Sequence, residues 1–211
     1  EVADVVKLEC VKVNDVVSRF ENNGIEVRNI DLGGGLGIDY DDPDGQPIPD
    51  FETWFTTIDK NLVRRPDQAV HIEPGRSLCA QAGSLITEVL YVKKGETRRF
   101  LMVDAGMNDL IRPALYGAYH KIENLSAYYE EADTRERKVY DVVGPVCESA
   151  DCFGKERILA KSRRGDRIAI RSAGAYGQVM ASHYNMRPLA PAVYSDRLAE
   201  GPRKKDYFAS E

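Results

Sequence analysis

The amino-acid sequence predicts an α/β region followed by an all-β region, with the change of pattern at about residue 83. Up to that point, segments with helical spacing of apolar residues alternate with short strand-like runs. Each run leads into a glycine-bearing loop, as in α/β folds such as (β/α) barrels, whose sites lie at the strand ends. Beyond it, short strand-like runs separated by turns have few helical segments between them, which is typical of an all-β domain.

The elements follow from the spacing of apolar residues along the chain. The first predicted helix ends at Asn22-Asn23-Gly24, residues that tolerate the left-handed backbone of a helix end. In the first region we expect a helix at 2–20, a strand at 25–32, a polar loop at 41–49, a helix at 51–62 and a strand at 70–72. In the second region we expect strands at 84–93, 100–104, 139–143 and 166–171, with an exposed excursion at 123–138.

Composition argues against several classes of function. The 211 residues are 43% hydrophobic and 30% charged, enough for a sizeable core, and the net charge of −5 argues against nucleic acid as the main partner. No apolar run approaches the roughly 18 residues of a membrane span, and no signal peptide opens the chain. The four cysteines include no zinc-type pair, so we expect reduced thiols in a cytoplasmic protein without a metal site.

Loops rich in glycine follow the two expected strands of the α/β region. Gly33–Gly35 comes after the first strand, and its bare backbone N–H groups can hold a phosphate; a tight structural turn is the alternative. After the second strand, Glu73-Pro74-Gly75-Arg76 sets an anion and a cation around a rigid turn. This pair suits an aromatic phosphate cofactor, with Arg76 on the phosphate and Glu73 on a ring nitrogen; a surface ion pair is the alternative.

Three candidate residues follow strands of the all-β region. Arg112 precedes a proline, which disfavours a helix interior, so it is a candidate for ligand binding rather than a plain surface arginine. Cys147 stands beside carboxylates, which disfavour its thiolate and leave a usable proton donor; a buried structural cysteine is the alternative. Tyr176 stands between glycines, where its phenol can bind phosphate or carboxylate; a plain turn tyrosine is the alternative.

The order of these motifs resembles the C-terminal half of the fold-type III pyridoxal-phosphate-dependent decarboxylases. The resemblance covers nearly all of residues 14–190 and is carried by residues 31–37, 73–76, 111–116, 147–151, 166–176 and 184–188. It implies the later strands and helices of a (β/α)8 barrel in residues 1–83 and a β-barrel or Greek-key-like domain in residues 84–190. Residues 191–211 match the family weakly and are assigned no role.

The resemblance also implies roles for individual residues. The residues that it implies for binding pyridoxal 5′-phosphate are Gly33, Gly34, Gly35, Glu73, Gly75, Arg76 and Tyr176. Glu73 would keep the pyridine nitrogen protonated, so that the ring accepts the electrons left by carbon dioxide. Cys147 would protonate the resulting carbanion by reaching across the interface of a homodimer. The residues that the resemblance implies for binding the substrate are Arg76, Arg112, Tyr116, Glu148 and Tyr176.

Within the family, the pattern is most similar to the enzymes that convert meso-2,6-diaminopimelate to L-lysine, the last step of lysine biosynthesis. This substrate carries a second amino-acid head, so its pocket needs a cation, Arg112, and an anion, Glu148, away from the reacting carbon. Ornithine-type substrates carry only a remote ammonium. A related decarboxylase acting on ornithine, arginine or a carboxylated polyamine stays open, as does a non-catalytic chain that only binds a partner subunit.

The family's Schiff-base lysine and its ring-stacking histidine have no counterpart in this sequence. In the family both lie in the N-terminal half of the barrel, and this chain begins at Glu1 rather than at a methionine. We therefore expect a C-terminal portion of the enzyme that is inactive alone and requires an N-terminal barrel half. Without that half, an open barrel edge would be prone to aggregation.

Overall fold

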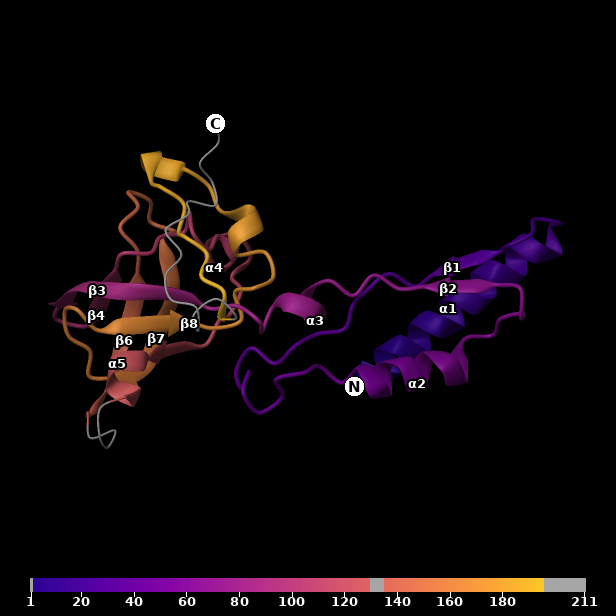
Figure 1. The fold of residues 1–211 in the computed structure, drawn as a ribbon, viewed down its shortest axis with the longest axis horizontal. Helices are drawn as coiled ribbons and strands as arrows, with labels where there is room; N and C mark the ends of the chain where they lie inside the picture. The colour runs from indigo at the N-terminus through magenta and orange to yellow at the C-terminus, as the bar shows by residue number, and fades with distance from the viewer. Residues whose placement is uncertain (1, 130–134, 196–211) are drawn as a thin grey trace.

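The computed structural model describes residues 2–129 and 135–195. Figure 1 shows two lobes joined by two extended segments. The helix lobe, residues 2–72, holds α1 (Val2–Asn22), β1 (Asn29–Asp31), α2 (Phe51–Asn61) and β2 (Ala69–His71). The short helix α3 (Arg76–Cys79) lies on one connection, and the sheet lobe comprises residues 85–195. Among the described residues, no helix is both long and apolar enough to cross a membrane.

The helix lobe packs one face of each helix onto a small shared core. Asp50 begins α2 by accepting a hydrogen bond from the Thr53 N–H at 2.9 Å, which satisfies one of the free donors of the first turn. Both expected helices are confirmed, each within two residues of the expected bounds. The buried core residues of the lobe are Val6, Cys10, Ile30, Leu32, Leu36, Trp54, Ile58 and Leu62.

Strands β1 and β2 are parallel, with Asn29 opposite Ala69 and Asp31 opposite His71. Parallel strands present their carboxyl ends at the same edge, so the loops that follow them start side by side. The strand expected at 25–32 is wrong in extent, because β2 offers partners to only three residues of that run.

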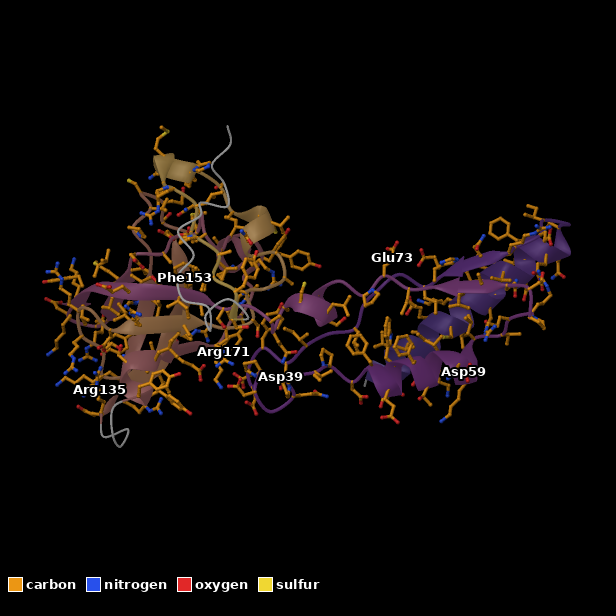
Figure 2. All side chains as sticks on the ribbon, viewed as in Figure 1. Asp39, Asp59, Glu73, Arg135, Phe153 and Arg171 are labelled. Atoms are coloured by element: carbon orange, nitrogen blue, oxygen red, sulfur yellow. The ribbon has the colours of Figure 1, made fainter. Side chains whose placement is uncertain are left out.

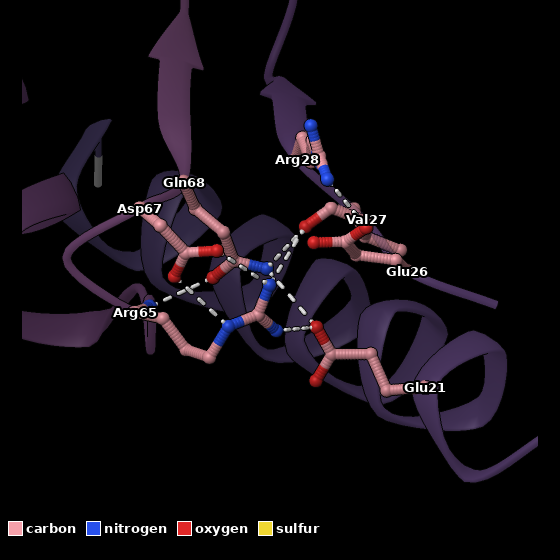
Figure 3. A network of polar contacts seen from close by, with 7 residues as sticks. All are labelled: Glu21, Glu26, Val27, Arg28, Arg65, Asp67 and Gln68. Carbon is pink, nitrogen blue, oxygen red and sulfur yellow. Dashed lines mark hydrogen bonds and ion pairs between the residues drawn. The ribbon is translucent and has the colours of Figure 1, made fainter. Parts of the chain in front are cut away.

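A polar network ties the end of α1 to the start of β2 (Figure 3). The guanidinium of Arg65 binds the Glu21 carboxylate, and it donates to the Val27 carbonyl at 3.2 Å and to Asp67 at 3.1 Å. Gln68, which is buried, donates to the same carbonyl at 2.8 Å. The network fixes the turn between α1 and β1 against the segment that enters β2.

The sheet lobe is built on six strands in the order β5-β8-β3-β4-β6-β7. The β4–β6 pair is parallel and the other pairs are antiparallel, so the sheet is mixed. The outermost strands β5 and β7 contact each other, and the sheet therefore nearly closes on itself. The bounds are β3 (Leu85–Lys94), β4 (Arg99–Val103), α4 (Arg112–Tyr116), β5 (Ile122–Asn124), α5 (Leu125–Tyr128), β6 (Arg137–Val143), β7 (Cys152–Ala160) and β8 (Arg167–Ile170), followed by the single turns Gln178–Met180 and Tyr184–Met186.

The four strands expected in this lobe are confirmed as β3, β4, β6 and β8, and β7 was missed. The expected exposed excursion at 123–138 is wrong at its start, because β5 and α5 lie there and bury Asn124 and Ala127. The Asn124 side chain begins α5 and also binds the buried Asp166 at 2.9 Å, which draws the segment into the sheet. Residues 196–211, with the basic run Arg203–Lys205, lie outside the described residues.

Candidate functional site

The glycine loop after β1 exposes its main chain. Gly33 and Gly35 have φ of 66° and 97°, in the left-handed region that favours glycine. The Gly33 N–H donates to the Asp31 side chain at 2.8 Å, which fixes the turn. A Cβ added at Gly33 or Gly35 would meet nothing within 4 Å, so bare backbone faces open space here. Such a surface lets an anion approach peptide N–H groups.

The loop after β2 lies directly against the glycine loop. The Glu73 N–H donates to the Gly33 carbonyl at 2.6 Å, and the Leu32 N–H donates to the His71 carbonyl at 3.0 Å. A Cβ on Gly34 would collide with the Glu73 carbonyl oxygen, so only glycine allows the two loops to approach this closely. The Glu73 side chain is exposed, and Figure 2 shows it on the segment that connects the two lobes.

Tyr176 reaches the same place from the sheet lobe. Its loop docks onto the end of α3, where the Gly174 N–H donates to the Ala80 carbonyl at 2.9 Å and a Cβ on Gly174 would collide with the Cys79 carbonyl. A Cβ added to Gly75 would lie 3.6 Å from the Tyr176 hydroxyl. The structure thus brings the glycine loop, the 73–76 loop and Tyr176 together.

Two arginines and two tyrosines form a cluster beside this point, which we call the arginine cluster: Tyr40, Arg76, Arg112 and Tyr176. Arg112 begins α4 and is 7% exposed, so the interpretation as a surface arginine is wrong. Its Nη1 donates to the Tyr40 hydroxyl at 2.9 Å. The guanidinium carbon of Arg112 lies 5.4 Å from the centre of the Tyr40 ring and 5.8 Å from that of Tyr176, and the carbon of Arg76 lies 6.0 Å from the Tyr40 ring centre.

His120 contacts Arg112 from the interior of the protein. This fully buried imidazole donates from Nδ1 to the Arg171 carbonyl at 2.8 Å, which leaves Nε2 to accept from Arg112 Nη1 at 3.0 Å. Burial lowers the pKa of His120 below its ordinary value, opposed by the bond to Arg171 and assisted by the charge of Arg112. The ring is therefore a neutral acceptor.

Neither arginine of the cluster is neutralised by a carboxylate in the part of the chain that the structure describes. Within residues 2–129 and 135–195, Arg76 and Arg112 form no ion pair. Arg171, by contrast, binds both Asp44 and Glu123 where the 39–46 segment meets the sheet lobe (Figure 2). Buried cations are normally paired, so the unpaired buried guanidinium of Arg112, with the half-buried and unpaired Arg76 near it, favours an anionic ligand.

Cys147 and Glu148 lie on another loop, residues 144–151. Both are exposed, so the alternative of a buried structural cysteine is wrong. The loop is held by the buried Asp151 carboxylate, which accepts the Met107 N–H at 2.7 Å and the Val146 N–H at 2.6 Å. Burial raises the pKa of Asp151, against these two hydrogen bonds. Tyr116, at the far end of α4 from Arg112, is also exposed.

Two residues that contact Arg112 were missed from the sequence. Tyr40 lies just before the polar loop at 41–49, which carried no motif, and His120 follows the 111–116 motif without belonging to it. Neither position has a local signal, because their partners are fixed only by the fold.

Comparison with known proteins places the chain in a family. A model described as the C-terminal sheet domain of pyridoxal-dependent decarboxylases matches residues 2–174. The chain belongs to this family. Its fold is the family's C-terminal sheet domain with a nearly closed mixed sheet.

Several relatives of the chain share one name. Diaminopimelate decarboxylase of Bacteroides thetaiotaomicron is 51% identical over 198 residues, which are 94% of this chain and 50% of the relative. The Aquifex aeolicus protein of that name is 43% identical over 86% of this chain and 42% of its own length. The structure of the Helicobacter pylori enzyme complexed with L-lysine matches with a TM-score of 0.72 and 40% identity, covering 89% of this chain and 43% of that one. The chain thus spans about half the length of the curated relatives it matches.

The residues present fit the family's cofactor. Pyridoxal phosphate carries a dianionic phosphate on an aromatic ring. The open backbone at Gly33 and Gly35 forms a cradle that a side chain would fill. The 73–76 loop bound to it carries the unpaired Arg76, and the Tyr176 hydroxyl lies near Gly75 of that loop. These are donors and positive charge, as a phosphate requires.

Proposed function

We propose that the protein containing this chain decarboxylates meso-2,6-diaminopimelate to L-lysine with pyridoxal phosphate. The single observation that carries the proposal is the buried Arg112, which has neutral partners and no carboxylate among the described residues. A substrate with a carboxylate far from its reacting carbon would supply that charge. Relatives at 51% and 43% identity carry the corresponding name.

The cofactor would be held where the two lobes meet. Backbone N–H groups of Gly34 and Gly35, in the turn that the Gly33 N–H fixes through Asp31, would hold the phosphate together with Gly75, Arg76 and Tyr176. Glu73, on the loop hydrogen-bonded to the glycine turn, would keep the pyridine nitrogen protonated. When bound, the cofactor supplies a sink for the electrons left behind by carbon dioxide.

The substrate's distal head would be recognised by opposite charges. Arg112 and Arg76 would bind the distal carboxylate, with Tyr116 and Tyr176 as phenol donors. Each charge-assisted hydrogen bond contributes about 1.5–3 kcal/mol, so two of them would favour this substrate over one lacking the carboxylate by several hundredfold or more.

The remaining two groups would act in a partner subunit. Glu148 would bind the distal ammonium and Cys147 would return the proton to the reacting carbon, both across the interface of a homodimer. Their exposure on the 144–151 loop, anchored to Met107 rather than to the arginine cluster, supports this arrangement.

The helix lobe would complete its barrel with chain from the rest of the protein. We assign residues 1–83 to a (β/α)8 barrel and residues 84–190 to a Greek-key-like β-domain. A groove of about 680 Å³ lined by Val13, Val16, Phe20 and Ile25 of the helix lobe offers apolar surface for the missing barrel half, which would carry the Schiff-base lysine.

A chimera tests the proposal. The N-terminal half of the Bacteroides thetaiotaomicron relative, fused to this chain, should bind pyridoxal phosphate with visible absorbance and release carbon dioxide and L-lysine from meso-diaminopimelate. The natural relative serves as the control. A folded chimera without the absorbance would overturn the proposal, whereas a chimera that acts on L-ornithine and spares diaminopimelate would support the related-decarboxylase alternative.

A further inference from the structure

Arg112 has its two protein acceptors on one nitrogen. Nη1 donates to the Tyr40 hydroxyl at 2.9 Å and to His120 Nε2 at 3.0 Å. Nε and Nη2 of Arg112 form no hydrogen bond with any described residue. Both nitrogens nevertheless remain accessible to solvent. One edge of the guanidinium is thus anchored, and the opposite edge, with the two parallel donors that match a carboxylate, remains reachable.

Both anchors are themselves fixed by the fold. His120 is fully buried and bound through Nδ1 to the backbone of Arg171 at the end of β8. Tyr40 precedes a segment held to the sheet lobe at two further points. Asp41 accepts from the Tyr119 hydroxyl at 2.9 Å, and Asp44 pairs with Arg171. Arg112 therefore keeps its orientation before any ligand arrives, which lowers the ordering cost of binding.

The chemistry of the anchors is equally specific. A carboxylate in either place would hold Arg112 more tightly, but it would also neutralise the charge that the ligand needs. A phenol and a neutral imidazole accept a hydrogen bond and leave the full positive charge available.

We propose that Tyr40 and His120 are positioning residues that aim Arg112 at the distal carboxylate of the substrate. This inference rests on the proposed function and names residues that discriminate a dicarboxylate from a diamine-type substrate. Neither residue touches the reacting atoms, so their loss affects binding of the distal head before it affects turnover.

Kinetics of the holoenzyme with matched variants test Tyr40. Tyr40→Phe removes the hydroxyl from Arg112 and should raise the KM for meso-diaminopimelate about tenfold, the value of one hydrogen bond to a charged group, while kcat changes less than about threefold. Tyr119→Phe removes a hydroxyl that holds the same segment without touching Arg112, and should leave KM within about twofold. Equal KM changes in the two variants would overturn the proposal, because segment docking would then explain both.

His120 is tested by rescue. In His120→Leu the acceptor is lost and KM should rise about tenfold, whereas in His120→Gln the amide oxygen can replace Nε2 and KM should return to within about threefold of the starting value. Where the leucine variant is poorly folded, Tyr40→Phe and His120→Gln still decide the question. Equal impairment by Leu and Gln would contradict the role of His120.

Binding of pimelate provides a readout independent of turnover. This dicarboxylate lacks amino groups, and the increase in Tm that it causes should be smaller in Tyr40→Phe and unchanged in Tyr119→Phe. Absence of diaminopimelate turnover in the unsubstituted holoenzyme would refute the proposed function. Normal turnover with an unchanged KM and pimelate response in Tyr40→Phe would refute only the positioning role.

Discussion

The two lobes differ in how completely each buries its apolar residues. The sheet lobe closes nearly all of its sheet around a core in which Leu101, Val142, Ile168 and Ile170 have no exposed surface. The helix lobe leaves Val16 of α1 49% exposed and keeps an apolar groove beside β1. Large exposed apolar surface normally marks a contact with another chain segment. The sheet lobe encloses its core with its own strands, whereas the helix lobe leaves an apolar groove open beside its core.

The largest expected effect lies in the core of the sheet lobe. Ile168→Ala opens a cavity in the core of the sheet lobe and should lower the free energy of unfolding by about 2–5 kcal/mol. Val16→Ala shortens a side chain that is 49% exposed, and should change the same free energy by less than about 0.5 kcal/mol. Urea unfolding followed by circular dichroism measures both, and similar losses in the two variants would contradict the contrast between the lobes.

The next effect concerns the loop that carries Cys147. Met107 and Val146 donate to different oxygens of Asp151, so Asp151→Asn keeps one acceptor and places an amide donor opposite the other N–H, which should cost about 1–3 kcal/mol. Asp59→Asn on the exposed face of α2 is the matched control and should be nearly neutral. If Asp151→Asn unfolds at the same urea concentration as the unsubstituted chain, then the carboxylate does not anchor this loop.

Most of the fold could be predicted from the local sequence pattern. The elements and contacts that were missed have physical reasons. Helix α2 has clear periodicity of its apolar residues, so both its presence and its bounds were predicted. Strand β7 was missed because Gly154-Lys155-Glu156-Arg157 interrupts its apolar run with residues that suit a turn. For the site, glycine loops after strands identified Gly33–Gly35 and Gly75. Tyr40 lies 72 residues from Arg112, and such a contact exists only once the lobes are in place.

A third prediction concerns the junction of the lobes. Gly34→Ala forces the glycine loop away from Glu73 and should weaken pyridoxal phosphate binding by the chimera about tenfold, the effect of a steric cost of about 1–3 kcal/mol. Gly37→Ala meets nothing within 4 Å and needs no left-handed backbone, so its affinity should match that of the unsubstituted chimera. Titration of the cofactor absorbance measures both. Equal affinities would show that close approach of the two loops is not needed.

The smallest effect is the pH dependence caused by His120. Because burial lowers its pKa in the folded chain below the ordinary 6.5, the unfolded chain binds the proton more readily. Stability should therefore decrease as pH falls from about 6.5 toward the lowered pKa, and it should be independent of His120 above that range. The slope should be shallower in His120→Gln. Identical pH profiles of the two proteins in urea unfolding would show that His120 is not buried as a neutral ring.

The central claim is that the unpaired guanidinium of Arg112 binds the distal carboxylate of the substrate. The most direct measurement is the affinity for pimelate of the cofactor-loaded chimera carrying Arg112→Ala, with the exposed Arg19→Ala as a control of equal charge change. Loss of a two-point charged contact predicts a decrease of about a hundredfold or more for Arg112→Ala and less than about twofold for Arg19→Ala. An affinity of Arg112→Ala within about twofold of the unsubstituted chimera would contradict the account.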